Sequence, residues 1–142
     1  MGTILTASAE LKNDKMMFLG ESGGHSVITD YVPPYGDGQG FMPLQLFLVS
    51  LSACLGGTVQ FLAKNMKRDV SGMTVSAEGE RRQSHPTMFE SIRLQVRVVS
   101  SDLSDEDMRG MLKKAEETLC PVAAMVKATV PLYMDYEIVR DK

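Results

Sequence analysis

Cysteine is scarce in this sequence: two of its 142 residues are cysteines, and there is no Cys-x-x-Cys motif. Two cysteines in a chain of this length are not the disulfide framework of a small secreted domain, and a thioredoxin-type redox motif is excluded. Histidine is equally rare, with only His25 and His85. Because a metal site would need both to converge with further ligands, and their spacing does not suggest this, we predict no metal and no cofactor.

An excess of charge of either sign is also lacking. The formal net charge is −3 and the isoelectric point is near 5.4. The lysines and arginines are spread along the chain without a basic stripe, which argues against a nucleic-acid partner. The first residues have neither a charged n-region nor a long apolar stretch. We therefore expect no signal peptide and a cytoplasmic protein whose thiols stay reduced unless chemistry oxidises them.

One long run without any charged residue extends from Gly38 to Ala63. Its length is enough to span a bilayer. However, the run contains several polar side chains and the Gly56-Gly57 pair, it lacks an aromatic belt, and no second hydrophobic segment follows. A helix that is apolar nearly all round is either membrane-spanning or wrapped by protein. From these features we predict a buried central helix and no membrane partner.

The rest of the chain divides into elements by its apolar periodicity and its turn residues. We predict strands at residues 4–12, 16–19, 25–29, 73–78, 92–98 and 130–138, and helices at residues 43–66, 104–119 and 122–127. This order is typical of an α+β fold with largely antiparallel sheet, and residues 1–142 suit a single domain. The first helix has more apolar faces than one small sheet can cover, so we expect a homodimer with this helix near the interface.

The two cysteines lie in different settings. Cys120 precedes Pro121 and would cap a new helix, where free backbone N–H groups and the helix dipole favour a sulfur anion. Cys54 lies in the middle of the long helix, where only weak donors such as the Thr58 hydroxyl are near in sequence. Two interpretations follow from the residues alone. The cysteines are inert core residues, or one is an attacking thiol and the other resolves its product.

Two segments of the chain resemble a known family. The pattern Met42–Leu48, followed by Ser52-Ala53-Cys54, is similar to the first cysteine motif of the OsmC/Ohr family of osmotically inducible and organic-hydroperoxide-resistance proteins. Residues Ala115–Lys127, which contain Cys120-Pro121-Val122, resemble the second cysteine motif. Each motif alone is weak, but both occur in the family's order and at its separation. The element order fits as well, so the likeness covers nearly the whole chain.

The resemblance implies an OsmC-like α+β fold, with largely antiparallel sheets packed around a long buried central helix in an intertwined homodimer. It also implies an antioxidant role in the stress response, as a thiol peroxidase that reduces organic hydroperoxides. Cys54 would then be the peroxidatic thiol, which becomes a sulfenic acid, and Cys120 would be the resolving thiol, which forms a disulfide with it. A lipoyl or other dithiol reductant would restore both, and an apolar pocket at the dimer interface would take the alkyl tail of the substrate.

The chain departs from the family's peroxidases at two positions. Those enzymes use an arginine from the N-terminal strands, or from the loop after them, to stabilise the thiolate, whereas this chain has no arginine before Arg68. They also use a glutamate just after the helix-starting proline to hold that arginine. Leu44 and Gln45 occupy the nearby positions here.

The segment 18–25 instead resembles the corresponding segment in a less characterised branch of the family. In that setting His25, Glu21 or Asp30 would replace the arginine, and Gln45 would be a further supporting residue. The absence of the family's arginine and glutamate also motivates a second hypothesis. In it the chain is a dimeric OsmC-fold protein that binds an apolar small molecule and has weak or no peroxidase activity.

Overall fold

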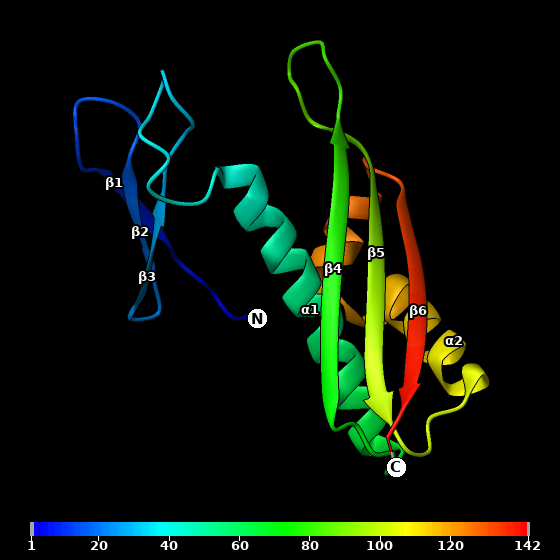
Figure 1. Cartoon of the computed structure of the whole chain (residues 1–142). Helices are drawn as coiled ribbons and strands as arrows, with labels where there is room; N and C mark the ends of the chain where they lie inside the picture. The colour runs from blue at the N-terminus through cyan, green and yellow to red at the C-terminus, as the bar shows by residue number, and fades with distance from the viewer. Residues whose placement is uncertain (1, 142) are drawn as a thin grey trace. The chain divides into compact units, whose positions relative to one another are not determined.

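The computed structural model describes residues 2–141, and the chain folds as two compact units, Met1–Phe47 and Leu48–Lys142. We call them the N-terminal and C-terminal units; that both belong to one domain stays a prediction. The N-terminal unit holds β1 (Ser8–Leu11), β2 (Phe18–Ser22), β3 (His25–Thr29) and the start of α1 (Pro43–Asn65) (Figure 1). The C-terminal unit holds the rest of α1, β4 (Gly72–Arg81), β5 (Phe89–Ser100), α2 (Asp105–Lys114), the π-helix η1 (Ala115–Leu119), α3 (Pro121–Lys127) and β6 (Leu132–Arg140).

The N-terminal unit is an antiparallel meander in the order β1-β2-β3. Gly23 and Gly24 form the turn between β2 and β3 with φ angles of 59° and 83°, which only glycine adopts readily in a two-residue hairpin. Among residues 2–47, only Asp30 and Gly36 are buried. The strands of this unit therefore enclose no apolar core of their own.

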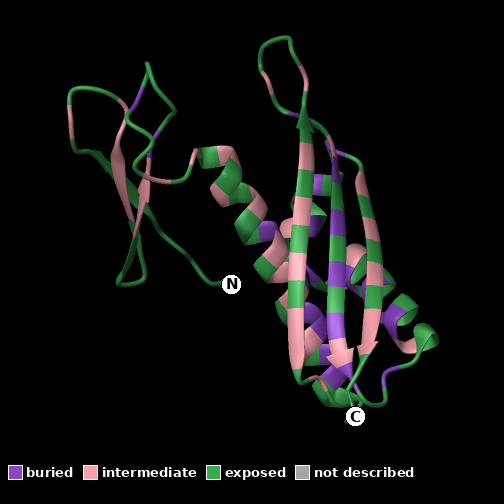
Figure 2. Ribbon diagram, in the orientation of Figure 1, coloured by how far each residue is buried: buried purple, intermediate pink, exposed green. Residues whose placement is uncertain are grey.

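The C-terminal unit has the sheet order β4-β5-β6, in which β4 pairs antiparallel with β5 and β6 pairs parallel with β5. Parallel neighbours need a crossover connection, and the chain between β5 and β6 supplies it as α2, η1 and α3. Figure 2 shows β5 banded along its length, because alternate side chains face the helices and the solvent. Its buried residues are Phe89, Ile92, Leu94, Val96, Val98 and Ser100.

Helix α1 is buried on one face rather than all round. Its buried residues are Leu51, Leu55, Thr58, Val59, Leu62 and Ala63. Gly56 lets the helix approach β4, since a Cβ atom there would lie 3.1 Å from Cγ2 of Val75. Within residues 2–141, α1 is the one helix long and apolar enough to cross a membrane by length and composition. Its contact with the sheet identifies it as the core helix that the sequence predicts.

The predicted fold class is confirmed: an α+β fold with two small sheets, a long central helix and three of four strand pairings antiparallel. The predicted start of α2 is confirmed too, where Ser104 and Asp107 cap each other reciprocally. The helix predicted to run to Leu119 changes at Ala115 from α-helical to π-helical hydrogen bonding. The parallel pairing of β6 was not predicted, because alternation places a strand but does not give its direction.

Candidate functional site

The two cysteines, 66 residues apart in sequence, meet in the C-terminal unit. The Sγ atoms of Cys54 and Cys120 lie 2.9 Å apart, and the Cys120 thiol donates a hydrogen bond to the Cys54 sulfur. Both cysteines are free. Because a disulfide bond is about 2.05 Å long, the two sulfurs are unbonded but in direct contact. The fold therefore brings together the two residues on which the sequence argument depends.

Cys120 is held at the junction between two helices. Its backbone N–H donates to the carbonyl of Ala115, five residues earlier, at 3.0 Å, which is the π-helical spacing. Pro121 then begins α3, where a fixed φ and a missing N–H cost nothing. Lys127 at the far end of α3 donates from Nζ to the carbonyl of Glu116 at 2.8 Å, which ties α3 back to η1. Cys120 is thereby fixed in a buried position.

The thiol of Cys120 is hard to ionise. Burial first, and then the hydrogen bond to Cys54, raise the pKa of Cys120 to about 11. The backbone N–H groups of Ala123 and Val122 act in the opposite direction but are outweighed, and Cys120 makes no side-chain capping hydrogen bond. The helix start does favour a Cys120 anion through these two N–H groups, as predicted, but loss of water around the sulfur exceeds that attraction. Cys120 is a neutral donor at neutral pH.

Cys54 borders a cavity of about 310 Å³. Its lining residues are Ala53, Cys54, Gly57, Thr58, Phe61 and Leu119, none of which carries a charge. The Thr58 hydroxyl donates to the backbone carbonyl of Cys54 at 2.9 Å, so it does not serve the sulfur as the sequence suggested. Cys54 is half-buried, whereas Cys120 is buried. Of the two sulfurs, the one that accepts the hydrogen bond also lines the open cavity.

Comparison with known proteins places this arrangement in a family. The family model described as OsmC-like protein matches residues 36–135. The chain belongs to the OsmC-like family. It is 30% identical over 125 residues to the protein YhfA of Escherichia coli strain K12, an alignment that covers 87% of this chain and 91% of YhfA. The family predicted from the two cysteine motifs is confirmed, and the match to YhfA agrees with a less characterised branch.

Two solved structures share the fold of this OsmC-like chain. A hypothetical protein from Aquifex aeolicus superposes with a TM-score of 0.88 at 24% identity, covering 99% of this chain and 100% of the other. An organic hydroperoxide resistance protein OsmC from Legionella pneumophila has a TM-score of 0.71 at 17% identity, covering 95% of this chain and 97% of the other. At these identities the similarity establishes the fold alone.

Asp30, one of the predicted supporting residues, organises the loop after β3. Its carboxylate accepts hydrogen bonds from the backbone N–H groups of Tyr31 at 2.8 Å, Asp37 at 3.2 Å and Gln39 at 3.1 Å. Burial by itself would raise the pKa of Asp30. These three donors, with a smaller effect from Lys15, outweigh it and hold the pKa below its usual value. The local function of Asp30 is therefore to fix the course of residues 30–39.

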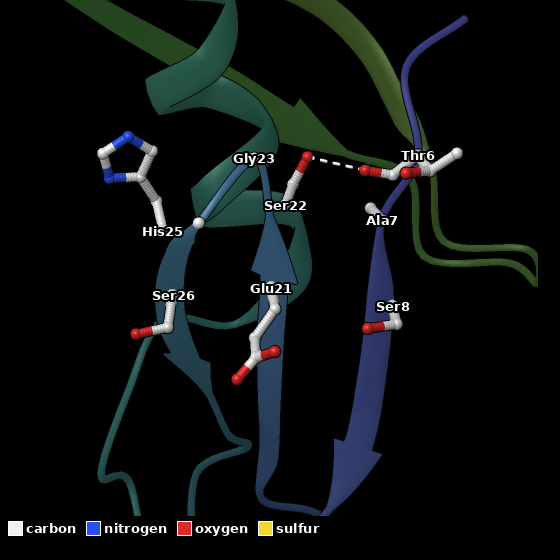
Figure 3. Close-up of a pocket in the computed structure, with 9 residues that line it drawn as sticks. Thr6, Ala7, Ser8, Glu21, Ser22, Gly23, His25 and Ser26 are labelled. Carbon is white, nitrogen blue, oxygen red and sulfur yellow. Dashed lines mark hydrogen bonds between the residues drawn. The ribbon is translucent and has the colours of Figure 1, made fainter.

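The other supporting candidates also lie in the N-terminal unit. Glu21 and His25 are exposed at the β2–β3 hairpin, where Figure 3 shows them beside serine side chains around an open pocket. Gln45 accepts a hydrogen bond through Oε1 from the N–H of Met42 at 2.9 Å and so caps the start of α1. The structure thus places all four supporting candidates in local settings within the N-terminal unit: Asp30, Glu21, His25 and Gln45. A part for them in the chemistry of the cysteines stays a prediction.

Sequence reasoning missed Gly57, Phe61 and Leu119 as residues of the cavity. A signal for two of them was present, because Gly57 and Phe61 follow Cys54 by three and seven positions and so share its side of a helix. Leu119 precedes Cys120 directly, but its approach to α1 depends on the packing of η1, for which the sequence gives no comparable signal.

Proposed function

We propose that this OsmC-like protein is a thiol-dependent peroxidase that reduces organic hydroperoxides through Cys54 and Cys120. The observation that supports this most directly is the 2.9 Å separation of the two sulfurs at the edge of an uncharged cavity. Two inert core cysteines need not meet, and a resolving thiol must reach the attacking one. The less buried sulfur, Cys54, is the one a substrate reaches first.

In the proposed cycle the Cys54 thiolate attacks the terminal oxygen of the hydroperoxide. The S–O bond forms as the O–O bond breaks, the alkoxide takes up a proton and leaves as an alcohol, and Cys54 becomes a sulfenic acid. The Cys120 sulfur then attacks the Cys54 sulfur. A disulfide forms, and the hydroxide that leaves takes the Cys120 proton and becomes water. A dithiol reductant supplies two electrons by thiol–disulfide exchange, which restores both thiols and leaves the reductant as a disulfide.

Cys120 also has a part in the first step of this proposal. The family's peroxidases stabilise their thiolate with an arginine, which this chain lacks before Arg68. A Cys120 thiol with a pKa of about 11 stays protonated at neutral pH and keeps donating its hydrogen bond to Cys54. In place of that arginine, the Cys120 thiol is the group that contacts the Cys54 sulfur and orients it for attack.

The surroundings support an apolar substrate and a partner subunit. Phe61 and Leu119, which line the cavity, are large apolar side chains that remain exposed, and so is Val49 on α1. The N-terminal unit has no apolar core of its own. We propose that the alkyl part of the hydroperoxide lies against Phe61 and Leu119, and that the protein is a cytoplasmic homodimer in which a second copy covers exposed apolar surface.

Hydroperoxide consumption in the presence of a dithiol reductant tests this function. The unaltered protein should turn over alkyl hydroperoxides, and Cys54→Ser should abolish turnover. Cys120→Ser should still be oxidised once at Cys54 but should accumulate the sulfenic acid, which a dimedone-type trapping reagent detects. Turnover that is unchanged in Cys54→Ser would contradict the proposal. Absence of turnover across several alkyl hydroperoxides would contradict it as well.

One observation favours a second candidate function, binding of an apolar small molecule without efficient chemistry. The cavity lining carries no charged group to polarise a peroxide, and the arginine and glutamate of the family's peroxidases are both missing. In that case an apolar ligand should bind with an affinity that Cys54→Ala leaves unchanged, while no hydroperoxide is consumed. Calorimetric titration of both proteins with a long-chain alcohol or fatty acid separates the two functions.

A further inference from the structure

Two adjacent glycines in the middle of α1 differ in their surroundings. Glycine is among the least favourable residues in a helix interior, so each calls for a reason. Gly56 has one in packing, because a Cβ atom there would lie 3.1 Å from Cγ2 of Val75 and 3.5 Å from Sδ of Met73. Among residues 2–141 of a single copy Gly57 has none, since a Cβ atom there would have nothing within 4 Å. Neither glycine has a positive φ angle, so backbone conformation does not explain Gly57.

Gly57 is placed beside the reacting sulfur. It lines the same cavity as Cys54, three residues later on the same side of the helix. Phe61, one turn further along, and Leu119 form the large apolar walls of this cavity. A side chain at position 57 would project into the space that Cys54 and Phe61 also line. The missing side chain therefore leaves open space at the place where a substrate bound to the cavity would carry its first carbon atoms.

We propose that Gly57 is a specificity-determining residue that admits hydroperoxides branched at the carbon bearing the O–O group. The inference rests on the proposed attack of Cys54 on a hydroperoxide. A tertiary carbon next to the peroxide needs room on the sulfur's side of the cavity, and glycine at position 57 provides that room. Hydrogen peroxide carries no alkyl group, so it does not need this room.

The test compares the two substrates in Gly57→Ala and Gly57→Leu. The rate of Cys54 oxidation in a single turnover is measured with cumene hydroperoxide and with hydrogen peroxide on the full chain. The ratio of the two rates should fall about tenfold or more in Gly57→Leu and by less in Gly57→Ala, because a few methylenes in a pocket change selectivity by that order. An unchanged ratio overturns the proposal. Gly57→Ala improves helix propensity and gives an answer even if Gly57→Leu does not fold.

Gly110 in α2 offers the matched control. It is an exposed helical glycine with open space around it, like Gly57, but it does not line the cavity. Gly110→Leu should leave the ratio of rates unchanged. A fall equal to that in Gly57→Leu would overturn the proposal, because the effect would then come from the helix change and not from the cavity.

A second measurement separates this proposal from the peroxidase function. Alkylation of Cys54 by iodoacetamide and by a bulky N-aryl maleimide is followed by mass spectrometry of the Cys54 peptide. The rate of Cys54 alkylation by the maleimide, relative to the rate with iodoacetamide, should fall in Gly57→Leu and stay unchanged in Gly110→Leu. If no hydroperoxide reacts with any variant, the peroxidase function fails, while this selectivity still supports Gly57 as the size limit of the cavity. Equal alkylation selectivity in all variants overturns it.

Discussion

The two units of this chain are stabilised by different means. In the N-terminal unit the only buried residues among 2–47 are Asp30 and Gly36, and the carboxylate of Asp30 orders its loop through three backbone hydrogen bonds. The C-terminal unit has an apolar core formed by one face of β5, the buried face of α1, and the helices between β5 and β6. The cysteines belong to this second unit.

The way in which each unit is stabilised decides what its side chains can do. An apolar core fixes side chains by close packing, so it can hold two sulfurs 2.9 Å apart and raise the pKa of the buried one. A loop arranged around a charged group depends on hydrogen bonds, and therefore on the protonation state of that group. The two units should accordingly respond differently to loss of volume, to added volume and to pH.

The largest effect is expected from a cavity in the C-terminal core. Leu55 in α1 is 0% exposed, and Leu55→Ala should lower the free energy of unfolding by about 3 kcal/mol, since it removes buried methyl groups and leaves a void. Lys64 in the same helix is exposed and carries no apolar surface for a partner to cover, so Lys64→Ala should change it by no more than about 0.5 kcal/mol. Urea denaturation of both variants measures the difference. Equal effects would mean that α1 is not packed as described.

Added volume at Gly36 should destabilise the N-terminal unit strongly. A Cβ atom at Gly36 would overlap the carboxylate of Asp30 and the carbonyl of Tyr31, so Gly36→Ala should cost about 2 kcal/mol. Gly110→Ala, in open space on α2, should be neutral or slightly stabilising. Thermal denaturation compares the two variants, and hydrogen exchange should locate the loss of protection in residues 30–39. Full protection of that loop in Gly36→Ala would contradict the role given to Asp30.

At high pH the C-terminal unit should lose stability through Cys120. The pKa of Cys120 is raised from 9.0 to about 11 in the folded protein, so the unfolded chain releases its thiol proton first as the pH rises. The contribution is fully present below pH 9 and is lost between pH 9 and about 11, by on the order of 1–2 kcal/mol. The measurement is the difference in unfolding free energy between the reduced protein and Cys120→Ala across this range. A difference that stays constant with pH would disprove the raised pKa.

At low pH the N-terminal unit should respond locally, with the smallest effect on global stability. The pKa of Asp30 is held below the ordinary 3.8, so its contribution is present above that value and disappears as the pH falls through the lowered pKa. The hydrogen-exchange protection factors of the Tyr31, Asp37 and Gln39 amides should then drop. Asp30→Asn should lack this protection at every pH. Protection that persists after an NMR titration shows the Asp30 carboxyl to be protonated would show that the loop does not depend on the charge.

Much of the site could be predicted from the sequence. The helical spacing around Cys54 and the Cys120-Pro121 step gave the elements on which both thiols lie, and the two motifs together gave the family. The ionisation of Cys120 could not be predicted, because the helix start is a local feature whereas burial of the sulfur depends on residues distant in sequence, Cys54 among them. The local contacts of Asp30 and Gln45 were likewise hidden, since a carboxylate or an amide in a sequence does not show which N–H groups it meets.

By itself the sequence determined the order of strands and helices and the two positions at which sulfur is present, because these follow from neighbours a few residues apart. Only the tertiary structure decided that the sulfurs touch, which of them is the hydrogen-bond donor and which glycine faces open space. Those properties depend on atoms that are close in space but distant along the chain. Burial, pKa and cavity shape arise only when such atoms are brought together.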